Sequence, residues 1–152
     1  LTGSTLRLNE DIKEVKKQVS VPVIGNGDVK TVTDAKCLLE QSGADGVMIG
    51  RGSYGKPWFL KQVIEYLNTG LAPKEPCPKT KFEIIKTHYQ SLLEHYGSNR
   101  GLRIARKHIG WYSKGLPGAS SFKAQFNAVE NAKLAQNMIT EFYAPIIEKM
   151  AK

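Results

Sequence analysis

Two glycine-rich turns carry the residue types and spacing in this sequence that suit the binding of an anion. Gly25 and Gly27 belong to the first turn, and Gly50 and Gly52 flank Arg51 in the second. Glycine lets the backbone bend sharply and bring bare N–H groups close to a ligand, because no Cβ stands in the way. Arg51 adds a planar and permanently charged group. The two turns together predict half of a phosphate-binding cradle.

Each turn follows a short apolar run and precedes an expected helix. The first unpaired N–H groups of such a helix and its positive dipole end favour an anion at the same point. A single turn of this kind is more often only a tight strand-to-helix connection, and that alternative stays open. Two turns in succession favour phosphate, because the loops after the last two strands of a (β/α)8 barrel form a recurrent phosphate site.

A second candidate binding feature is a basic helix, expected from Asn99 or Arg100 to about Lys114. At about 100° per residue, its basic residues fall on one side and its apolar residues on the opposite side. The basic side carries Arg100, Arg103, Lys107 and Lys114, and the apolar side carries Leu102, Ala105, Ile109 and Tyr112.

A solvated surface is the simpler interpretation of this basic side. Against it, no acidic residue occurs between Glu94 and Phe122 to balance the charge. His108 and Trp111 also lie beside the basic residues, and such rings suit stacking and hydrogen bonding to bases. We therefore predict contact with nucleic acid at this helix, through its basic residues and His108.

The positive charge of the chain is concentrated in its second half. The 152 residues carry a formal net charge of +8. Residues 1–78 hold ten Lys or Arg against nine Asp or Glu, a net of +1, and residues 79–152 hold twelve against five, a net of +7. A basic surface attracts polyanions, nucleic acid first among them.

Two strands are expected to position the glycine-rich turns. The apolar runs at Val21–Ile24 and Gly46–Ile49 have polar residues only at their ends, which suits parallel strands covered on both faces. Two strands alternating with helices require a parallel sheet, but they cannot close a barrel. The missing strands are expected upstream, because the chain begins with Leu1 rather than Met and resembles an interior start.

Three helices are expected around these strands. The first runs from Asn9, a plausible N-cap, to about residue 20. The second covers about residues 31–43, and the third opens at Pro57 and ends at Gly70. The third helix would bury Leu60, Val63, Ile64 and Leu67.

A Pro-rich stretch divides the chain. Residues 72–79 contain three prolines and can form neither a helix nor a central strand, so we predict a linker there. Thr80 and Glu83 have the spacing of a capping box at the start of the helical segment that follows. The predicted domains are the last part of an α/β barrel at residues 1–71, this linker, and a helical bundle at residues 80–152.

Composition excludes several classes of protein. With 41% hydrophobic and 24% charged residues, the chain is ordinary for a globular protein. No apolar run approaches the roughly 18 residues that span a membrane, so no membrane partner is expected. Cys37 and Cys77 lack metal-ligand spacing and neither lies beside an activating His. We expect no metal site and interpret both as inert thiols in a reducing cytoplasm.

Four segments carry a family resemblance. The first two contain the glycine-rich turns, Val-Pro-Val-Ile-Gly-Asn-Gly-Asp at residues 21–28 and Gly-Ala-Asp-Gly-Val-Met-Ile-Gly-Arg-Gly at residues 43–52. The others are Gly-Lys-Pro-Trp-Phe at residues 55–59 and Arg-Ile-Ala-Arg-Lys-His-Ile-Gly-Trp-Tyr at residues 103–112. Together they resemble the tRNA-dihydrouridine synthases, most closely the bacterial type. The turns alone are shared with other flavin barrels, but their combination with the Arg-Lys-His and Trp-Tyr helix is specific.

The resemblance implies an FMN-dependent (β/α)8 TIM barrel followed by a helical tRNA-binding domain, with NADPH as the reductant. In that family, reduced flavin delivers hydride to the uracil C5=C6 bond, and a cysteine supplies the proton. Neither Cys37 nor Cys77 matches that cysteine, so the catalytic residues and the remainder of the barrel are expected upstream. This chain alone is expected to be inactive. By the same resemblance, the residues that hold the FMN phosphate are Asn26, Gly27, Asp28, Gly50 and Arg51.

Two alternatives belong to other functional classes. One is a different FMN-binding TIM-barrel oxidoreductase, similar to the dihydroorotate dehydrogenases. A basic helical domain is not expected in such an enzyme. The other is a non-catalytic RNA-binding module in which the barrel segment is only a scaffold. A flavin absorption spectrum and a tRNA-binding measurement would distinguish these alternatives from a tRNA-dihydrouridine synthase.

Overall fold

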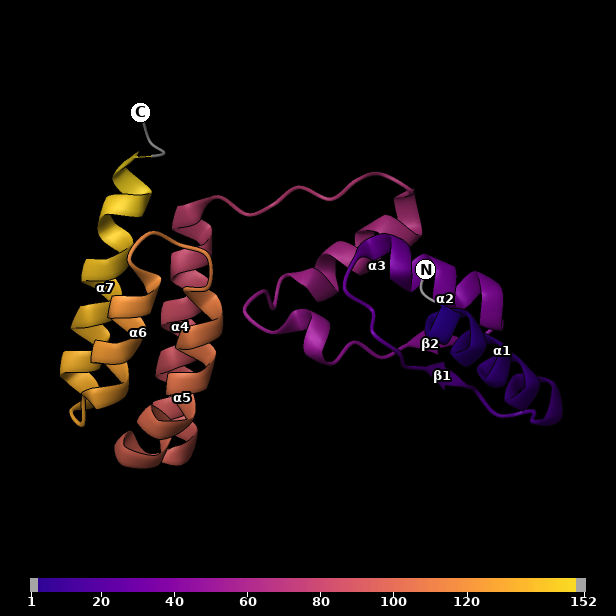
Figure 1. Cartoon of the computed structure of the whole chain (residues 1–152), viewed down its shortest axis with the longest axis horizontal. Helices are drawn as coiled ribbons and strands as arrows, with labels where there is room; N and C mark the ends of the chain where they lie inside the picture. The colour runs from indigo at the N-terminus through magenta and orange to yellow at the C-terminus, as the bar shows by residue number, and fades with distance from the viewer. Residues whose placement is uncertain (1–2, 150–152) are drawn as a thin grey trace. The chain divides into compact units, whose positions relative to one another are not determined.

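A computed structural model of the chain describes residues 3–149 and divides it into two compact units (Figure 1). The first unit comprises residues 1–74, and the second comprises residues 75–152. The division falls inside the Pro-rich stretch at residues 72–79. Each unit buries apolar side chains of its own.

The first unit alternates helices with strands. Its elements are α1 (Gly3–Gln18), β1 (Ile24–Gly25), α2 (Val32–Ser42), β2 (Gly46–Val47), the short 3₁₀ helix η1 (Arg51–Ser53) and α3 (Phe59–Thr69). The two strands pair in parallel, with Ile24 opposite Gly46. They are shorter than the predicted runs, but the order of helices and strands and the parallel pairing are as predicted.

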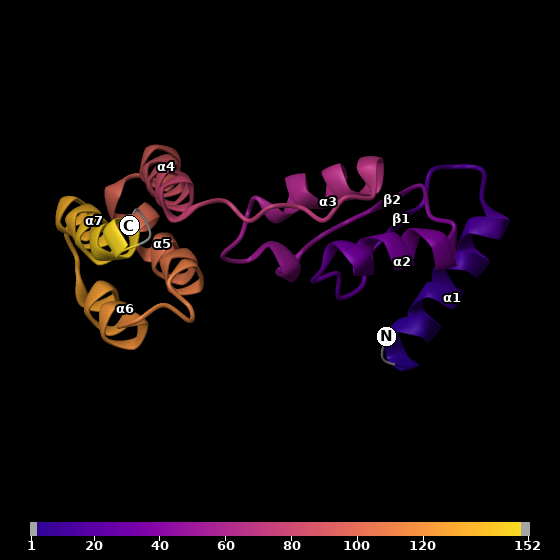
Figure 2. The ribbon, with the colours of Figure 1, turned by 90° about the horizontal axis from the view of Figure 1, so that it is seen from above.

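The central helix of the first unit is α2. It contacts α1, α3 and both strands, and it runs alongside the strand pair (Figure 2). Ala35 and Leu38 of α2 are buried together with Val29, Phe59 and Val63. Burial of this apolar cluster fixes α2 against the strands that end in the glycine-rich turns.

The strand pair is open on one side within this chain. Ile24 is 60% exposed and Met48 is 51% exposed, so the predicted cover on both faces is not present among the described residues. A parallel strand pair normally has both faces covered, because its connections place helices on them.

The predicted inward face of α3 is largely wrong. The helix begins at Phe59 rather than Pro57, and it buries Phe59 and Val63 against α2. Of the four residues predicted to be inward, only Val63 is buried. Two apolar faces lie side by side on this helix, and the described residues pack against only one of them. The exposed face carries Leu60, Ile64 and Leu67.

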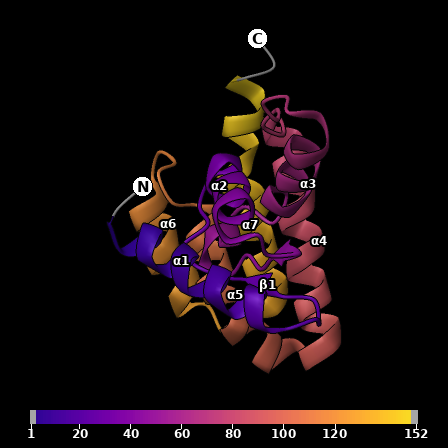
Figure 3. The same cartoon turned by 90° about the vertical axis from the view of Figure 1, so that its right-hand side faces the viewer.

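The prediction that Asn9 caps the first helix is also wrong. α1 begins at Gly3, so Asn9 lies inside it, and its side chain is buried. The Asn9 Nδ2 donates a hydrogen bond of 2.8 Å to Oε1 of Gln41 on α2. The two helices lie against each other (Figure 3), and this bond supplies a buried amide with a partner.

The second unit is a helical bundle, seen nearly along its helix axes in Figure 2. Its helices are α4 (Pro78–Tyr96), α5 (Ser98–Tyr112), α6 (Ala119–Ala128) and α7 (Ala132–Lys149). In the part of the chain that the structure describes, no strand follows β2. The core contains Ile85, Tyr89, Leu102, Ile109, Phe126 and Ile139.

A tight glycine connection joins α4 to α5. Gly97 has a φ of +77°, which other residues rarely adopt. A Cβ on Gly101 would lie 2.6 Å from the backbone oxygen of Leu92, so only glycine allows this close approach. The pairing of the two helices fixes which side of α5 faces outward.

The predicted capping box at Thr80 and Glu83 is wrong. α4 begins at Pro78 with Cys77 as its N-cap, so both residues lie inside the helix. Proline suits the first helical position because its missing N–H would have no partner there.

Candidate functional site

The two glycine-rich turns form opposite walls of one cleft in the first unit. Its volume is about 260 Å³, and all five residues predicted to hold a phosphate line it. The lining residues are Asn26, Gly27, Asp28, Val29, Lys30, Gly50, Arg51, Gly52 and Tyr54. The turns meet because both follow parallel strands, whose carboxyl ends lie at the same edge of the sheet.

Glycine is required by packing at some positions of the cleft and not at others. A Cβ on Gly52 would lie 2.0 Å from the backbone oxygen of Val29, so this residue lets the second turn touch the first. A Cβ on Gly27 would lie 2.1 Å from the Leu8 side chain. By contrast, a Cβ on Gly50 would meet no atom within 4 Å. Gly50 therefore borders open space.

An ion pair crosses the cleft. Nη2 of Arg51 lies 2.9 Å from Oδ1 of Asp28, and Nζ of Lys30 lies 3.9 Å from the same oxygen. The Arg51 side chain is 79% exposed, so solvent screens the pair strongly. Asp28 has a φ of +44°, a conformation that Asp tolerates better than most residues. Two cations thus face one carboxylate, which leaves the cleft with net positive charge.

The N–H groups at the N-terminus of α2, which were expected to bind an anion, are mostly hydrogen-bonded within the protein. Thr31 is the N-cap, and its Oγ1 accepts a hydrogen bond of 3.1 Å from the Asp34 backbone N–H. The Asp34 carboxylate in turn accepts from the backbone N–H groups of Lys30 and Thr31. In the described part of the chain, the N–H groups of Gly27, Asp28 and Gly50 donate to no protein acceptor. The turns, rather than the helix end, present free donors.

Lys30 is a cleft residue that the sequence reasoning missed. A basic residue two positions after Asp28, in an expected anion-binding turn, was the available signal. Lys56 lies nearby and donates from Nζ to the Lys30 backbone oxygen at 3.0 Å.

The predicted sidedness of α5 is confirmed by the structure. Leu102, Ala105, Ile109 and Tyr112 are buried, and Arg100, Arg103 and Lys107 are exposed. Lys114 is exposed too, but it lies in the turn after the helix ends at Tyr112.

A groove between α5 and α6 gathers only part of the predicted RNA-binding set. Arg103 and Lys107 line it, whereas Arg100, His108 and Lys114 do not. The guanidinium of Arg100 instead lies 5.3 Å from the Tyr96 ring centroid. The other lining residues are Arg106, Gly110, Trp111, Lys123 and Asn127. Lys123 comes from α6, and no pattern within α5 could have predicted it.

His108 belongs to a cluster of rings between α4 and α5. Its ring centroid lies 4.7 Å from that of His88, whose Nδ1 is 2.8 Å from the Tyr112 hydroxyl. Burial lowers the pKa of His88. Burial also lowers the pKa of His108, and His88 and Lys107 nearby lower it further. Both imidazoles therefore favour the neutral form, so His108 serves as a packing group between the His88 and Trp111 rings rather than as a cation.

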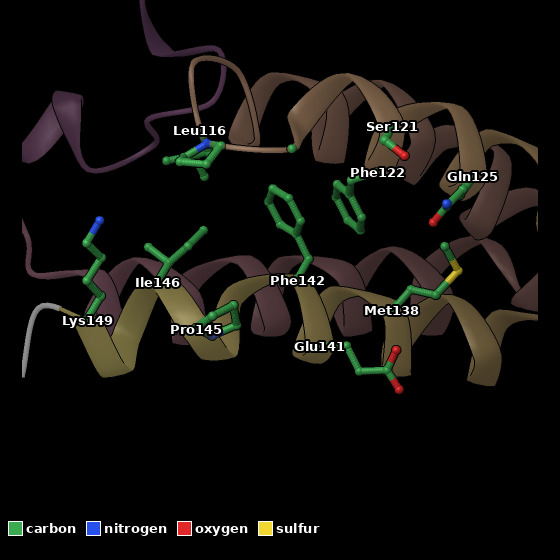
Figure 4. A pocket seen from close by; sticks show the side chains of 12 residues that line it. Leu116, Ser121, Phe122, Gln125, Met138, Glu141, Phe142, Pro145, Ile146 and Lys149 are labelled. Atoms are coloured by element: carbon green, nitrogen blue, oxygen red, sulfur yellow. The ribbon is translucent and has the colours of Figure 1, made fainter.

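An apolar groove lies between α6 and α7 (Figure 4). The Phe122 and Phe142 rings stack there at 4.0 Å with an interplanar angle of 9°, and Met138 and Ile146 extend the apolar lining. The Glu141 side chain points away from the gap (Figure 4). The groove therefore offers mainly apolar packing, with Lys149 at one end of its lining.

Three further observations narrow the possible chemistry. Among residues 3–149, no group of three or more His, Cys, Asp or Glu is arranged to hold a metal ion. No helix in that range has the length and apolar character needed to cross a membrane. Cys37 lies half-buried in α2, and Cys77 is exposed at the start of α4.

The chain matches the model of a protein family along nearly all of its length. That family is described as dihydrouridine synthase (Dus), and the match covers residues 3–147. A probable tRNA-dihydrouridine synthase of Rickettsia bellii is 44% identical over 140 residues, which are 92% of this chain and 43% of that protein.

Two further relatives bear the name tRNA-dihydrouridine synthase B. The protein of Pseudomonas aeruginosa is 40% identical over 136 residues, covering 89% of this chain and 41% of its own length. The protein of Vibrio vulnificus is 43% identical over 135 residues, covering 88% of this chain and 42% of its own length. The chain thus spans about two fifths of the length of the curated relatives it matches.

Proposed function

Because this chain belongs to the dihydrouridine synthase family, we propose that the protein containing it reduces uridine to dihydrouridine in tRNA. FMN is the proposed cofactor and NADPH its reductant. The observation that carries the proposal is the cleft in which both glycine-rich turns meet beside Arg51. The proposed location is the cytoplasm.

The residues of the cleft fit the phosphate end of FMN. Free backbone N–H groups at Gly27, Asp28 and Gly50 are suitable donors to phosphate oxygens, and Arg51 and Lys30 supply positive charge. Open space at Gly50 leaves room for a close approach. Since the exposed Asp28–Arg51 pair is worth only about 0–1 kcal/mol, Arg51 can turn from Asp28 to a phosphate at little cost.

The cleft suits a phosphate group rather than a whole cofactor. Its volume of about 260 Å³ lies below the roughly 300–1,000 Å³ of typical small-molecule sites. We infer that the rest of FMN is held by other parts of the protein. When bound, the flavin supplies the hydride for the uracil C5=C6 bond.

The exposed apolar surface of the first unit supports a barrel. Ile24 and Met48 on the strand side, and Leu60 and Ile64 on α3, are all at least 45% exposed. Exposed apolar residues on the same small unit mark a surface that another part of a protein covers. We propose that further strands and helices of a TIM barrel cover it, in agreement with the greater length of the relatives.

The second unit is the proposed tRNA-binding part. Arg103 and Lys107 lie on the exposed side of α5, and residues 79–152 carry a net charge of +7 from twelve basic and five acidic residues. Phosphate contacts supply most of the affinity for nucleic acid and make it salt-dependent. A stacked uridine must be drawn out of the tRNA fold before its ring can react, and the second unit would hold the tRNA meanwhile.

A flavin spectrum of the purified protein tests the proposal against its alternatives. We expect a flavin absorption band, and release of FMN on denaturation, together with salt-dependent binding of tRNA. A flavin-free protein that still binds tRNA would favour a non-catalytic RNA-binding module, a function that the basic second unit alone would support. A flavoprotein without affinity for tRNA would favour another barrel oxidoreductase.

A further inference from the structure

The groove between α5 and α6 brings cations from two helices together. Arg103, Arg106 and Lys107 come from α5, and Lys123 comes from α6. We propose that this groove, rather than the whole exposed side of α5, seats the sugar–phosphate backbone of the RNA substrate, with Lys123 as a phosphate-binding residue. The proposal rests on the tRNA-binding function proposed above.

The side chain of Lys123 lies against Gly110 on the basic side of α5. A Cβ built on Gly110 would lie 3.3 Å from Cε of Lys123 and 3.6 Å from its Cδ. The aliphatic stem of Lys123 therefore lies directly over the α5 backbone at this glycine. A Cβ at position 110 would require the stem to move by a few tenths of an ångström, because the contact is tighter than ordinary packing.

Arg106, one of the four cations of the groove, is bonded to the C-terminal end of α6. Its Nη2 donates a hydrogen bond of 3.0 Å to the backbone oxygen of Val129, the residue that ends α6. The Nε of the same guanidinium is buried and has no protein acceptor. Arginine carries five N–H donors, and one of them is bound in this way to the α6 C-terminus. Arg106 is thus both a brace between the helices and part of the cationic lining.

The cations of the groove are not neutralised within the protein. In the described part of the chain, no carboxylate lies within ion-pair distance of Arg103, Lys107 or Lys123. Like charges held close together without counter-charges repel one another, so their gathering favours a polyanionic partner.

An aromatic ring in the same groove favours RNA over an acidic protein. Trp111 lines the groove, and Nζ of Lys107 lies 5.6 Å from its ring centroid. Cations interleaved with an aromatic ring suit a nucleic-acid strand, which offers phosphates and stacking bases together. Arg100 and Lys114, which lie outside the groove, are not needed for this arrangement.

The test compares Lys123→Ala with Lys133→Ala in the protein that contains this chain. Lys133 is an exposed lysine on α7 outside the groove, so both variants remove one charge from the second unit. Binding of unmodified tRNA is measured by fluorescence anisotropy over a series of salt concentrations. Lys123→Ala is expected to weaken binding and reduce the steepness of log K against log salt by about 0.7–0.9, the value for one lost phosphate contact. Lys133→Ala should leave the slope unchanged.

Gly110→Ala separates positioning from folding. Alanine favours helix over glycine, so this variant should melt no lower than the wild type. It should weaken tRNA binding by less than Lys123→Ala does, because the lysine stem has to move only a few tenths of an ångström, and adding it to Lys123→Ala should cause no further loss. A role of Gly110 in folding alone would not produce this combination.

Three outcomes would overturn the groove proposal. The first is an unchanged salt slope in Lys123→Ala. If Arg100→Ala with Lys114→Ala, two residues outside the groove, still lowered the slope in that case, tRNA binding by the exposed side of α5 would survive and only the groove would fail. The second is an equal effect of Lys123→Ala and Lys133→Ala, which indicates general attraction. The third is Lys123-dependent binding of poly-glutamate with no binding of tRNA, which indicates an acidic protein partner.

Discussion

The carboxylate of Asp28 lies 2.9 Å from a guanidinium nitrogen of Arg51, an ion pair that joins the two glycine-rich turns across their cleft. These residues are far apart in the sequence and meet because the turns follow neighbouring parallel strands. Both side chains are more than half exposed, so the pair contributes little to the stability of the fold. Its consequence is that Arg51 stands over the cleft and remains available to a phosphate.

Arg51→Ala is expected to weaken FMN retention by about 1.5–3 kcal/mol, the range for a hydrogen bond to a charged group. The melting temperature of the flavin-free protein should hardly change, because the pair with Asp28 is exposed. Fluorescence titration with FMN measures the first effect. Arg100→Ala, in the second unit, is the matched control. An unaltered FMN affinity in Arg51→Ala would show that Arg51 does not bind FMN.

Gly52→Ala and Gly50→Ala are expected to act differently although both lie beside Arg51. A Cβ at residue 52 would meet the Val29 backbone oxygen, so this variant should lose about 1–3 kcal/mol of unfolding free energy, as overpacked sites do. Gly50→Ala should fold normally, because its Cβ meets nothing within 4 Å, but it should bind FMN more weakly. Thermal melts and FMN titrations distinguish the two. Equal FMN affinity in Gly50→Ala and wild type would show that no ligand approaches there.

Arg103→Ala combined with Lys107→Ala should lower affinity for many tRNAs alike. Each lost phosphate contact removes close to one released counterion, so the slope of log K against log salt should become shallower by about one to two units. Folding should be nearly unaffected, because both side chains are exposed. Tyr112→Ala, on the buried side of α5, should instead destabilise the second unit by roughly 3–5 kcal/mol, by analogy with other large aromatic deletions. If the double variant kept the wild-type slope, the basic side would be only solvated.

The second unit should lose stability in mild acid. The pKa values of His88 and His108 are lowered in the folded state, so the unfolded chain binds more protons as the pH falls below about 6.5. The contribution of the two neutral imidazoles is fully present above that pH and is lost as the pH falls through the folded-state pKa values. Thermal melts between pH 5 and 8 measure this change.

His108→Gln should flatten that pH dependence, and His95→Gln, which changes an exposed residue of α4, should not. The rings that surround His108 are those of His88 and Trp111, with Lys107 as the neighbouring charge. Equal pH dependence in His108→Gln and wild type would mean that the cluster does not couple to folding.

Periodicity and turn chemistry correctly predicted the features that the local sequence determines. The buried residues of α5 were predicted because its apolar and basic residues separate cleanly at the helical period. The bounds of α2 were predicted at about Thr31 and at Gly43, and the structure has these two residues as its caps. The meeting of the two glycine-rich turns followed from the parallel arrangement of their strands.

The errors and omissions depend on contacts between distant residues. Asn9 has the residue type of a cap, but α1 begins at Gly3, and the Asn9 side chain instead bonds to Gln41 of α2. Asp34 occupies N–H groups that the sequence left open for an anion. Lys123 comes to the basic groove from α6, and its stem passes over α5 at a glycine, Gly110. None of these contacts produces a pattern within a single sequence segment from which it could have been predicted.

The formation of dihydrouridine in tRNA is the measurement that tests the central claim most directly. The protein containing this chain would be incubated with FMN, NADPH and tRNA transcribed without modifications, and the nucleosides would be analysed by mass spectrometry. We predict dihydrouridine at defined positions, dependent on NADPH and strongly reduced in Arg51→Ala at limiting FMN. A protein that retains flavin and binds tRNA, yet forms no dihydrouridine in any tRNA, would contradict the account.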